Sequence, residues 1–102
     1  MGDYITVLKT GDLAPGTSTT IEVKGAKIAL FNVGGSFHAI DNTCLHRGGP
    51  LGEGSLNEKT VTCPWHGWEY SVETGKCETT PNLCVKRYDV KLDGDNVKIL
   101  IE

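Results

Sequence analysis

The chain has 102 residues, enough for one small domain but not for a second sizeable core. Its 10 Lys and Arg against 13 Asp and Glu give a formal net charge of −3, which gives no sign of a basic surface for nucleic acid or an anionic membrane. With 38% hydrophobic residues the chain is too apolar to be disordered. No apolar run approaches the roughly 18 residues needed to cross a bilayer.

The first forty residues are expected to form antiparallel strands. Apolar and polar residues alternate there in three short segments, the pattern of a half-buried strand. Gly25 is expected to turn the second segment into the third. Gly34 and Gly35 are expected to form the next hairpin turn, because glycine tolerates the positive φ that such turns need. The alternating segments are 5–7, 21–23 and 28–30.

The end of the chain contains the clearest hairpin. Apolar residues alternate over 90–92 and again over 97–101, and Asp93-Gly94-Asp95 lies between them as a turn. The chain is therefore expected to begin and end in strands.

The middle of the chain, from residue 42 to about 83, has a different composition. It is rich in Gly and Pro, weak in periodicity, and holds or borders all four cysteines and both tryptophans. Residues 51–59 have room for one helical turn at most. Such a segment buries little apolar surface alone, so we expect a bound metal centre to order it.

Two short segments with metal-ligand spacing stand in this region: Cys44-Leu45-His46 and Cys63-Pro64-Trp65-His66. We expect a cytoplasmic chain, in which thiols stay reduced, so the cysteines favour metal binding or free thiols over disulfides. Two Cys and two His can hold a tetrahedral zinc, although zinc fingers rarely use mixed Cys–His pairs. They can also hold an iron–sulfur cluster in which two His replace two Cys on one iron.

With these motifs the sequence resembles the Rieske proteins over nearly its whole length. The resemblance implies an all-β, Rieske-like fold: antiparallel sheets form a basal region, 1–42 with 84–102, and a small loop-rich cluster-binding lobe, 43–83, is inserted into it. The whole chain, 1–102, would be a single Rieske domain. The residues that carry the resemblance are Cys44-x-His46, Arg47, a Gly-rich turn with Leu51 and Gly54, Cys63-Pro64-Trp65-His66-Gly67-Trp68-x-Tyr70, Thr74-Gly75 and Pro81.

The resemblance implies one [2Fe–2S] cluster. Cys44 and Cys63 would ligate one iron, and the ring nitrogens of His46 and His66 would ligate the other. Replacing two thiolates by two neutral imidazoles makes the site less negative. The reduction potential then rises from roughly −400 mV into the range of about −150 to +300 mV.

The position within that range depends on hydrogen bonds to sulfur. The quinol-oxidising branch of the family carries two further cysteines, paired in a disulfide, and a serine near the ligands. Here Gly49, Trp65 and Trp68 take those places, so we expect a low potential. Tyr70 remains where that branch keeps a tyrosine, so one hydroxyl is still expected near the site.

The remaining candidates have competing interpretations. His38 is expected to be an ordinary strand residue, and Cys77 and Cys84 are expected to be free thiols packed as small apolar groups. Arg47 suits either a partner's carboxylate or an internal ion pair. Trp65 is expected to shield the cluster, while Trp68 and Tyr70 suit either the core or an aromatic docking surface.

Two further groups of residues bear on partners. Leu45, Pro50 and Pro81 are expected to form an apolar rim at the histidine edges. The acidic residues either complement a basic reductase or form a solvated surface; they are Glu53, Glu58, Glu69, Glu73 and Glu78.

The chain lacks a dinucleotide-binding fingerprint and a second metal motif. The hypothesis is a soluble, monomeric Rieske-type ferredoxin, an electron carrier and not an enzyme, without nucleic acid or membrane as partners. It would take electrons from an NAD(P)H-dependent flavoprotein reductase and pass them to a terminal aromatic-ring oxygenase. The alternatives are the small subunit of an NAD(P)H nitrite reductase and a structural zinc-binding interaction module.

Overall fold

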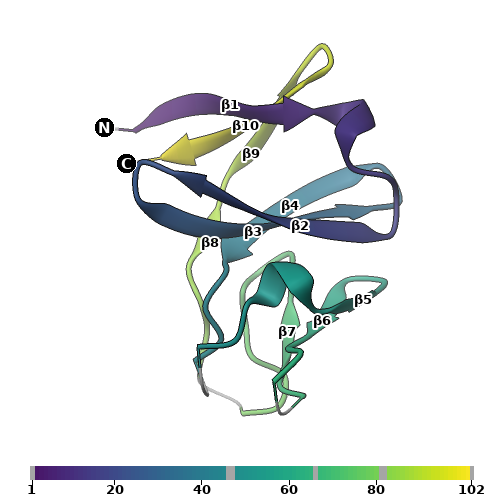
Figure 1. Ribbon diagram of the computed structural model, residues 1–102, viewed down its shortest axis with the longest axis vertical. Coiled ribbons are helices and arrows are strands. Elements are labelled where there is room, and N and C mark those ends of the chain that lie inside the picture. The colour runs from purple at the N-terminus through teal and green to yellow at the C-terminus, as the bar shows by residue number, and fades with distance from the viewer. Residues whose placement is uncertain (1, 46–47, 66, 81–82, 102) are drawn as a thin grey trace.

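The computed structural model describes residues 2–45, 48–65, 67–80 and 83–101 (Figure 1). These residues form three antiparallel sheets, in the orders β1-β10-β9, β2-β3-β4-β8 and β5-β6-β7. The all-β architecture of antiparallel sheets expected from the sequence is confirmed. The strands are β1 (Asp3–Lys9), β2 (Thr17–Val23), β3 (Ala26–Val33), β4 (Ser36–Asp41), β5 (Ser55–Asn57), β6 (Thr60–Thr62), β7 (Glu69–Ser71), β8 (Arg87–Tyr88), β9 (Val90–Asp93) and β10 (Asn96–Ile101).

Helical structure in the described ranges is limited to two 3-10 turns, η1 (Thr10–Asp12) and η2 (Leu51–Glu53). The second lies in the segment where the sequence allowed one helical turn at most. No helix in these ranges is long and apolar enough to span a bilayer.

The hairpin turns lie where the glycines predicted them. Gly25 has φ 82° between β2 and β3, and Lys24 beside it has φ 50°. Gly34 and Gly35 have φ 60° and 100° between β3 and β4. Gly94 turns β9 into β10 with φ 61°. Glycine adopts these left-handed conformations without steric strain, so the glycine-containing turns set the register between the paired strands.

The first two sheets pack together in the upper part of Figure 1, where both chain termini also lie. Their shared apolar cluster draws on strands from both ends of the chain. Burial of these side chains supplies the hydrophobic stabilisation of this basal region. The buried members are Leu13, Ile28, Leu30, Ala39, Val97, Ile99 and Ile101.

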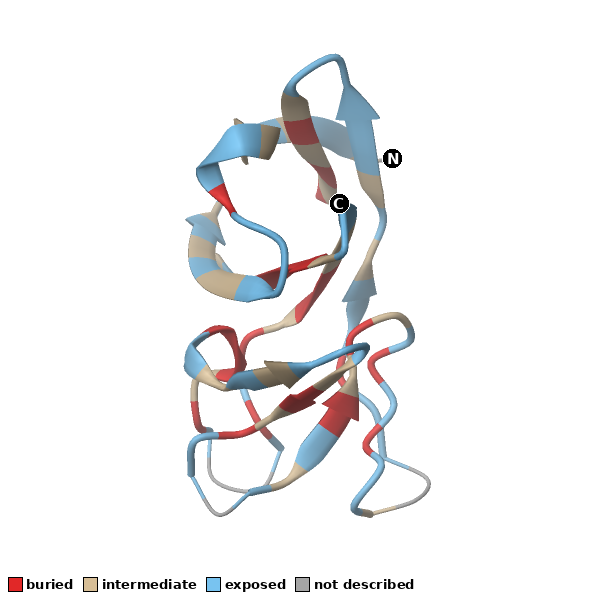
Figure 2. Cartoon of the chain, turned by 90° about the vertical axis from the view of Figure 1, so that its right-hand side faces the viewer, coloured by how far each residue is buried: buried red, intermediate tan, exposed pale blue. Residues whose placement is uncertain are grey.

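A second apolar cluster lies below, beside the small sheet. Buried residues run through both halves of the molecule (red in Figure 2). Strand β3 contributes to both clusters: Ile28 and Leu30 face the basal cluster, whereas Ala29 and Phe31 belong to the second. Successive side chains of a strand point to opposite faces, so β3 is the wall between the two regions. The buried members of the second cluster are Ala29, Phe31, Ile40, Cys44, Leu51, Val61, Cys63, Tyr70, Val72, Cys77 and Val85.

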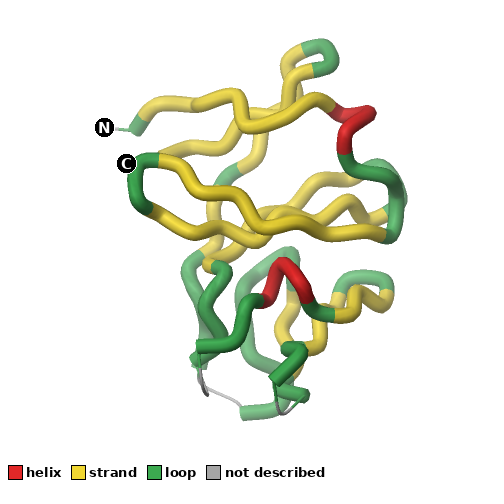
Figure 3. Tube along the Cα trace, viewed as in Figure 1, coloured by secondary structure: helices red, strands yellow, loops and turns green. Residues whose placement is uncertain are grey.

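The sequence did not reveal the small sheet. Its three strands have three residues each, too short to show a period, and they are surrounded by loops (green in Figure 3). The segment is therefore more ordered by its own apolar side chains than expected, because Val61 and Tyr70 pack on the wall that β3 provides. We propose 43–83 as the boundaries of this lobe.

Candidate metal centre

The first cysteine of the motif, Cys44, lies in a loop that turns back on itself just after β4. Its N–H donates to the Gly49 carbonyl at 2.9 Å, and its own carbonyl accepts the Gly48 N–H at 2.8 Å. A bridge between Thr43 and Pro50 closes the base of the loop. These contacts hold the Cys44 backbone independently of any bound group.

The second cysteine, Cys63, begins the loop between β6 and β7. Its N–H donates to the Trp68 carbonyl at 2.7 Å, which closes the loop. The Trp65 N–H points back at the Cys63 sulfur, with a nitrogen-to-sulfur distance of 3.4 Å. A sulfur atom that accepts a backbone N–H is stabilised in its negatively charged, metal-binding form.

The structure brings the two cysteines together. Both side chains are buried, with exposed fractions of 1% and 2%, and neither is in a disulfide. Burial raises the pKa of Cys63, and the neighbouring Cys44 thiol raises it further. Two adjacent buried thiolates are costly unless a cation offsets their charge. The donor set therefore fits a metal centre.

Tyr70, on β7, holds the first cysteine loop from the buried side. Its hydroxyl lies 3.4 Å from the Cys44 sulfur and accepts the Leu45 N–H at 3.0 Å. Burial, followed by the bond to Cys44, raises the pKa of Tyr70 well above its ordinary value, so the hydroxyl keeps its proton. The expectation that this hydroxyl reaches the site is confirmed, and Tyr70 is at the same time part of the core.

The other predicted ligands, His46 and His66, lie outside the described residues, as do Arg47 and Pro81. Within the part of the chain that the structure describes, no group of three or more potential metal ligands is found. The assignment of two histidines to the site therefore remains a prediction.

The apolar residues beside the cysteines differ in exposure. Leu45 and Trp65 are 48% and 50% exposed, and Leu83, which directly precedes Cys84, is 39% exposed. Pro50 is half-buried. Trp68 is also half-buried and packs against the second apolar cluster, which places it in the core.

The two remaining cysteines are free, as predicted, but they differ in environment. Cys77 is buried, and its sulfur lies 3.3 Å from the Thr80 nitrogen, whose N–H it accepts. Cys84 is exposed, so the expectation that it packs as a small apolar group is wrong. The Cys77 N–H pairs with the Leu83 carbonyl, which puts Cys84 on the next position of the opposing segment, where its side chain faces solvent.

Other residues considered in the sequence analysis make ordinary strand and surface contacts. His38 is half-buried in β4 opposite Phe31, in keeping with a strand residue. Of the acidic residues, Glu73 forms an ion pair with Lys59 at 3.5 Å. The Glu69 and Glu78 carboxylates accept threonine hydroxyls.

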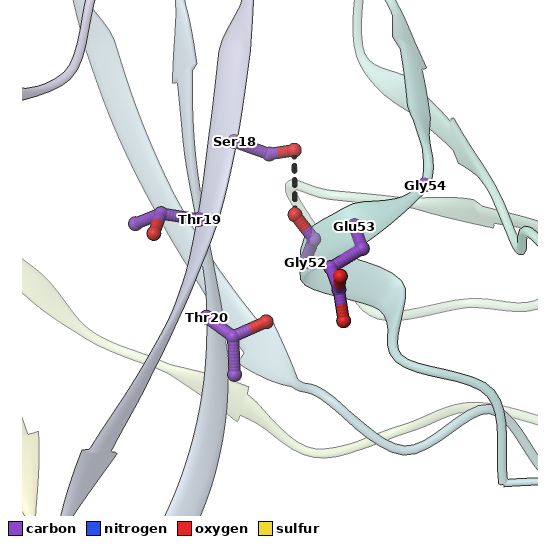
Figure 4. Close-up of a pocket in the computed structure, with 6 residues that line it drawn as sticks. All are labelled: Ser18, Thr19, Thr20, Gly52, Glu53 and Gly54. Carbon is purple, nitrogen blue, oxygen red and sulfur yellow. Dashed lines mark hydrogen bonds between the residues drawn. The ribbon is translucent and has the colours of Figure 1, made fainter.

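Asn42 is a buried residue whose role the sequence analysis missed. Its side-chain oxygen accepts the Gly52 N–H at 2.7 Å and the Thr20 hydroxyl at 3.0 Å, which fixes η2 to β2 just before the first ligand loop. The Ser18 hydroxyl donates to the Gly52 carbonyl across the same junction (Figure 4). The hydroxyl-lined groove there is a seam between the two regions. An Asn two positions before Cys44 was the only available signal.

The fold and the loop motifs agree with a known family. A profile for the Rieske [2Fe-2S] domain matches residues 3–89. The chain belongs to the Rieske family. As a Rieske domain it holds one [2Fe–2S] cluster, in keeping with the two buried thiols.

Three known proteins show how this Rieske domain compares with others. The ferredoxin component of biphenyl 2,3-dioxygenase from Rhodococcus jostii is 39% identical over 94% of this chain and 91% of its own. A chain of a structure described as the complex of reduced oxygenase and oxidised ferredoxin in carbazole 1,9a-dioxygenase is 28% identical, with a TM-score of 0.87 over 94% of this chain and 91% of that one. A putative NADH-dependent nitrite reductase small subunit from Mycobacterium tuberculosis has a TM-score of 0.92 over 100% of this chain and 97% of that one. At 20% identity, that likeness shows the fold alone.

Proposed function

We propose that this Rieske protein is a soluble, cytoplasmic one-electron carrier and not itself an enzyme. It takes electrons from an NAD(P)H-dependent flavoprotein reductase and delivers them to a terminal aromatic-ring oxygenase. The proposal is supported by the 39% identity to a dioxygenase ferredoxin over nearly both whole chains. It is supported as well by the exposed apolar side chains beside the buried cysteines.

We propose Cys44 and Cys63 as ligands of one iron and His46 and His66 as ligands of the other. The bound cluster supplies reversible one-electron chemistry. The cysteine thiolates hold it from the buried side. The Tyr70 hydroxyl and the Trp65 N–H, both 3.4 Å from a cysteine sulfur, offset the negative charge there.

The number of hydrogen-bond donors to the sulfur atoms sets the expected reduction potential. Gly49, Trp65 and Trp68 provide neither the disulfide nor the serine hydroxyl of the quinol-oxidising branch. The midpoint potential is therefore expected near the bottom of the Rieske range, about −150 mV. A redox titration followed by visible absorbance measures it, and a midpoint well above zero would contradict the hypothesis.

The docking surface we propose is formed by Leu45, Trp65 and Leu83, which are 48%, 50% and 39% exposed. Of the rim residues expected from the sequence it includes Leu45, whereas Pro50 is half-buried and Pro81 lies outside the described residues. Leu45 follows Cys44 in the first cysteine loop, Trp65 lies in the second, and Leu83 lies directly before Cys84. A small apolar contact of this kind suits transient binding of a monomeric carrier, because both partners must release it after each electron.

The alternative functions have less support. Likeness to nitrite reductase small subunits rests on fold alone, at 20% identity. The zinc-module hypothesis conflicts with the match to a Rieske [2Fe-2S] domain over residues 3–89.

An electron-transfer assay tests the proposal. Candidate reductases and oxygenases are combined with this protein as the only link, and product formation is measured against its concentration. Truncating an interface side chain that matters costs more than about 1 kcal/mol, so Leu45→Ala is expected to lower the second-order rate about fivefold or more. Leu92→Ala, on β9 and 47% exposed, is the matched control and is expected to leave the rate unchanged. Equal rates for the two variants would contradict the docking surface, and no transfer with any pair would contradict the proposed function.

A further inference from the structure

Trp65 contacts both cysteine loops. Its backbone N–H donates to the Cys63 sulfur within the second loop. The base of its indole ring lies against Gly49 in the first loop: a Cβ added to Gly49 would lie 3.2 Å from both Cβ and Cγ of Trp65. A single residue therefore connects the two loops.

Position 49 requires glycine because of this close contact and not because of its backbone conformation. Gly48 beside it has φ +73°, which favours glycine, whereas Gly49 lies outside the left-handed region. Gly49 is nevertheless buried, and a Cβ there would stand 2.6 Å from the Cys63 sulfur. The missing side chain allows the second loop to approach the first.

The Trp65–Gly49 contact complements the one made by Tyr70. Tyr70 is fully buried and holds the first loop through its hydroxyl, at the Cys44 sulfur and the Leu45 N–H. Trp65 is half exposed and joins the loops from the solvent side. The exposed contact is apolar, so it depends on packing, which is lost when either surface changes shape.

We propose that Trp65 is a positioning residue that staples the second ligand loop onto Gly49 of the first, and so holds Cys44 and Cys63 at the spacing that retains the cluster. The inference rests on the proposed ligand set and is independent of which partners the protein serves. Trp65 then has a role in the isolated protein, before any docking.

The test measures cluster loss from the purified holoprotein without partners. Visible absorbance and released iron are followed after addition of a chelator. Without the Trp65–Gly49 contact, Trp65→Ala is expected to lose its cluster at least about fivefold faster than the parent protein. This change in rate corresponds to about 1 kcal/mol. Trp65→Phe keeps an aromatic ring on the same Cβ and is expected to restore most of the retention. Leu92→Ala, which truncates a similarly exposed side chain on β9, is expected to stay within about twofold of the parent protein.

Gly49→Ala separates stapling from mere shielding. The added methyl covers more of the site but forces the ring or the Cys63 sulfur away, so stapling predicts faster loss and an altered electron paramagnetic resonance (EPR) signal. Gly11→Ala is the control, because a Cβ there meets nothing within 4 Å. The proposal would be overturned if Trp65→Ala lost its cluster at a rate within twofold of the parent protein. It would also be overturned if Gly49→Ala lost its cluster no faster than the parent protein.

The two failures are distinguishable. A parent protein that binds no [2Fe–2S] cluster overturns the proposed function. A parent that retains its cluster, with all variants behaving alike, overturns only the staple. If Trp65→Ala fails to load a cluster, Trp65→Phe and Gly49→Ala still decide the question.

Discussion

The basal region and the cluster lobe are ordered by different means. Basal strands β1 and β3 have seven and eight residues, whereas the lobe strands have three each. The basal region closes an apolar cluster between two sheets. The lobe instead combines a smaller sheet with hydrogen bonds to sulfur and close backbone approaches, as at Gly49. Apolar burial thus supports both regions, and in the lobe a few polar contacts also place the cysteine side chains.

The two regions nevertheless share a strand and a hydrogen-bonded junction. β3 gives one face to each apolar cluster, and Asn42 binds η2 to β2 directly before the first ligand loop. Because each region also has its own buried apolar cluster, mutations should separate into those that remove the site from an intact scaffold and those that weaken the scaffold beneath an intact site.

The largest expected effect comes from the proposed ligands. Cys44→Ser and Cys63→Ser are each expected to abolish the Rieske EPR signal and bring bound iron close to zero, because hydroxyl oxygen is a poor substitute for a thiolate. The basal sheets should keep their far-ultraviolet circular dichroism, since their core excludes both residues.

Cys77→Ser and Cys84→Ser are the matched controls and should keep the signal. Loss of the cluster in Cys77→Ser would mean that the ligands are wrongly assigned. If Cys44→Ser or Cys63→Ser lost the far-ultraviolet circular dichroism of the basal sheets together with the cluster, the two regions would not be separable.

The next largest effect is expected in the basal core. Leu30 is fully buried, so Leu30→Ala should lower the free energy of unfolding by roughly 2–5 kcal/mol. Urea denaturation measures the loss, and the EPR signal below the transition should be unchanged. The exposed Leu92→Ala should shift stability by less than about 0.5 kcal/mol. A changed EPR signal in Leu30→Ala would show that core packing also sets the site.

These contrasts explain what the sequence could predict. The basal hairpins follow from alternation and from glycines such as Gly25 and Gly34, which are local signals. The Cys and His pairs are a local signal too, and they were sufficient to identify the family. The lobe sheet was missed because Val61 and Tyr70 become core residues only through a distant strand, β3.

The sequence also failed to predict whether certain side chains are buried or exposed. Cys84 reads as a small apolar residue, but its position opposite Lys76, beside the buried Cys77, turns it to solvent. Asn42 is polar and reads as a loop residue, although two partners satisfy its side-chain oxygen in a buried junction. Both outcomes depend on pairings that no local pattern records.

A smaller effect is expected from the Tyr70 hydroxyl, which joins β7 to the first cysteine loop. Tyr70→Phe keeps the packed ring but removes the contacts to the Cys44 sulfur and the Leu45 N–H. The reduced site loses a donor, so the midpoint potential should fall by about 40 mV, equivalent to ~1 kcal/mol for one electron. Tyr88→Phe, on β8, removes a hydroxyl in the other region and should leave the potential unchanged. A potential that stays constant in Tyr70→Phe would show that the bond is not made in the holoprotein.

The smallest expected effect is a pH dependence of stability that arises at His38, where β4 meets the lobe. Burial lowers the pKa of His38, as do Arg87 and Lys59, while Glu73 opposes the shift. The unfolded chain therefore binds a proton more readily, so stability should be highest above the usual pKa of about 6.5 and fall as the pH drops below it. His38→Phe should reduce this slope in urea denaturation between pH 7 and pH 5. An unchanged slope of the free energy of unfolding against pH would show that groups other than His38 cause the pH dependence.

The most direct test of the account concerns the histidines. The reduced protein is prepared with ¹⁵N-labelled histidine, and the hyperfine couplings between nitrogen and the cluster electron are measured. The account predicts two coupled histidine nitrogens, one lost in His46→Ala and one in His66→Ala if a cluster still assembles, and both kept in His38→Asn. A reduced cluster with no histidine coupling, or a colourless protein holding a single zinc ion, would contradict it.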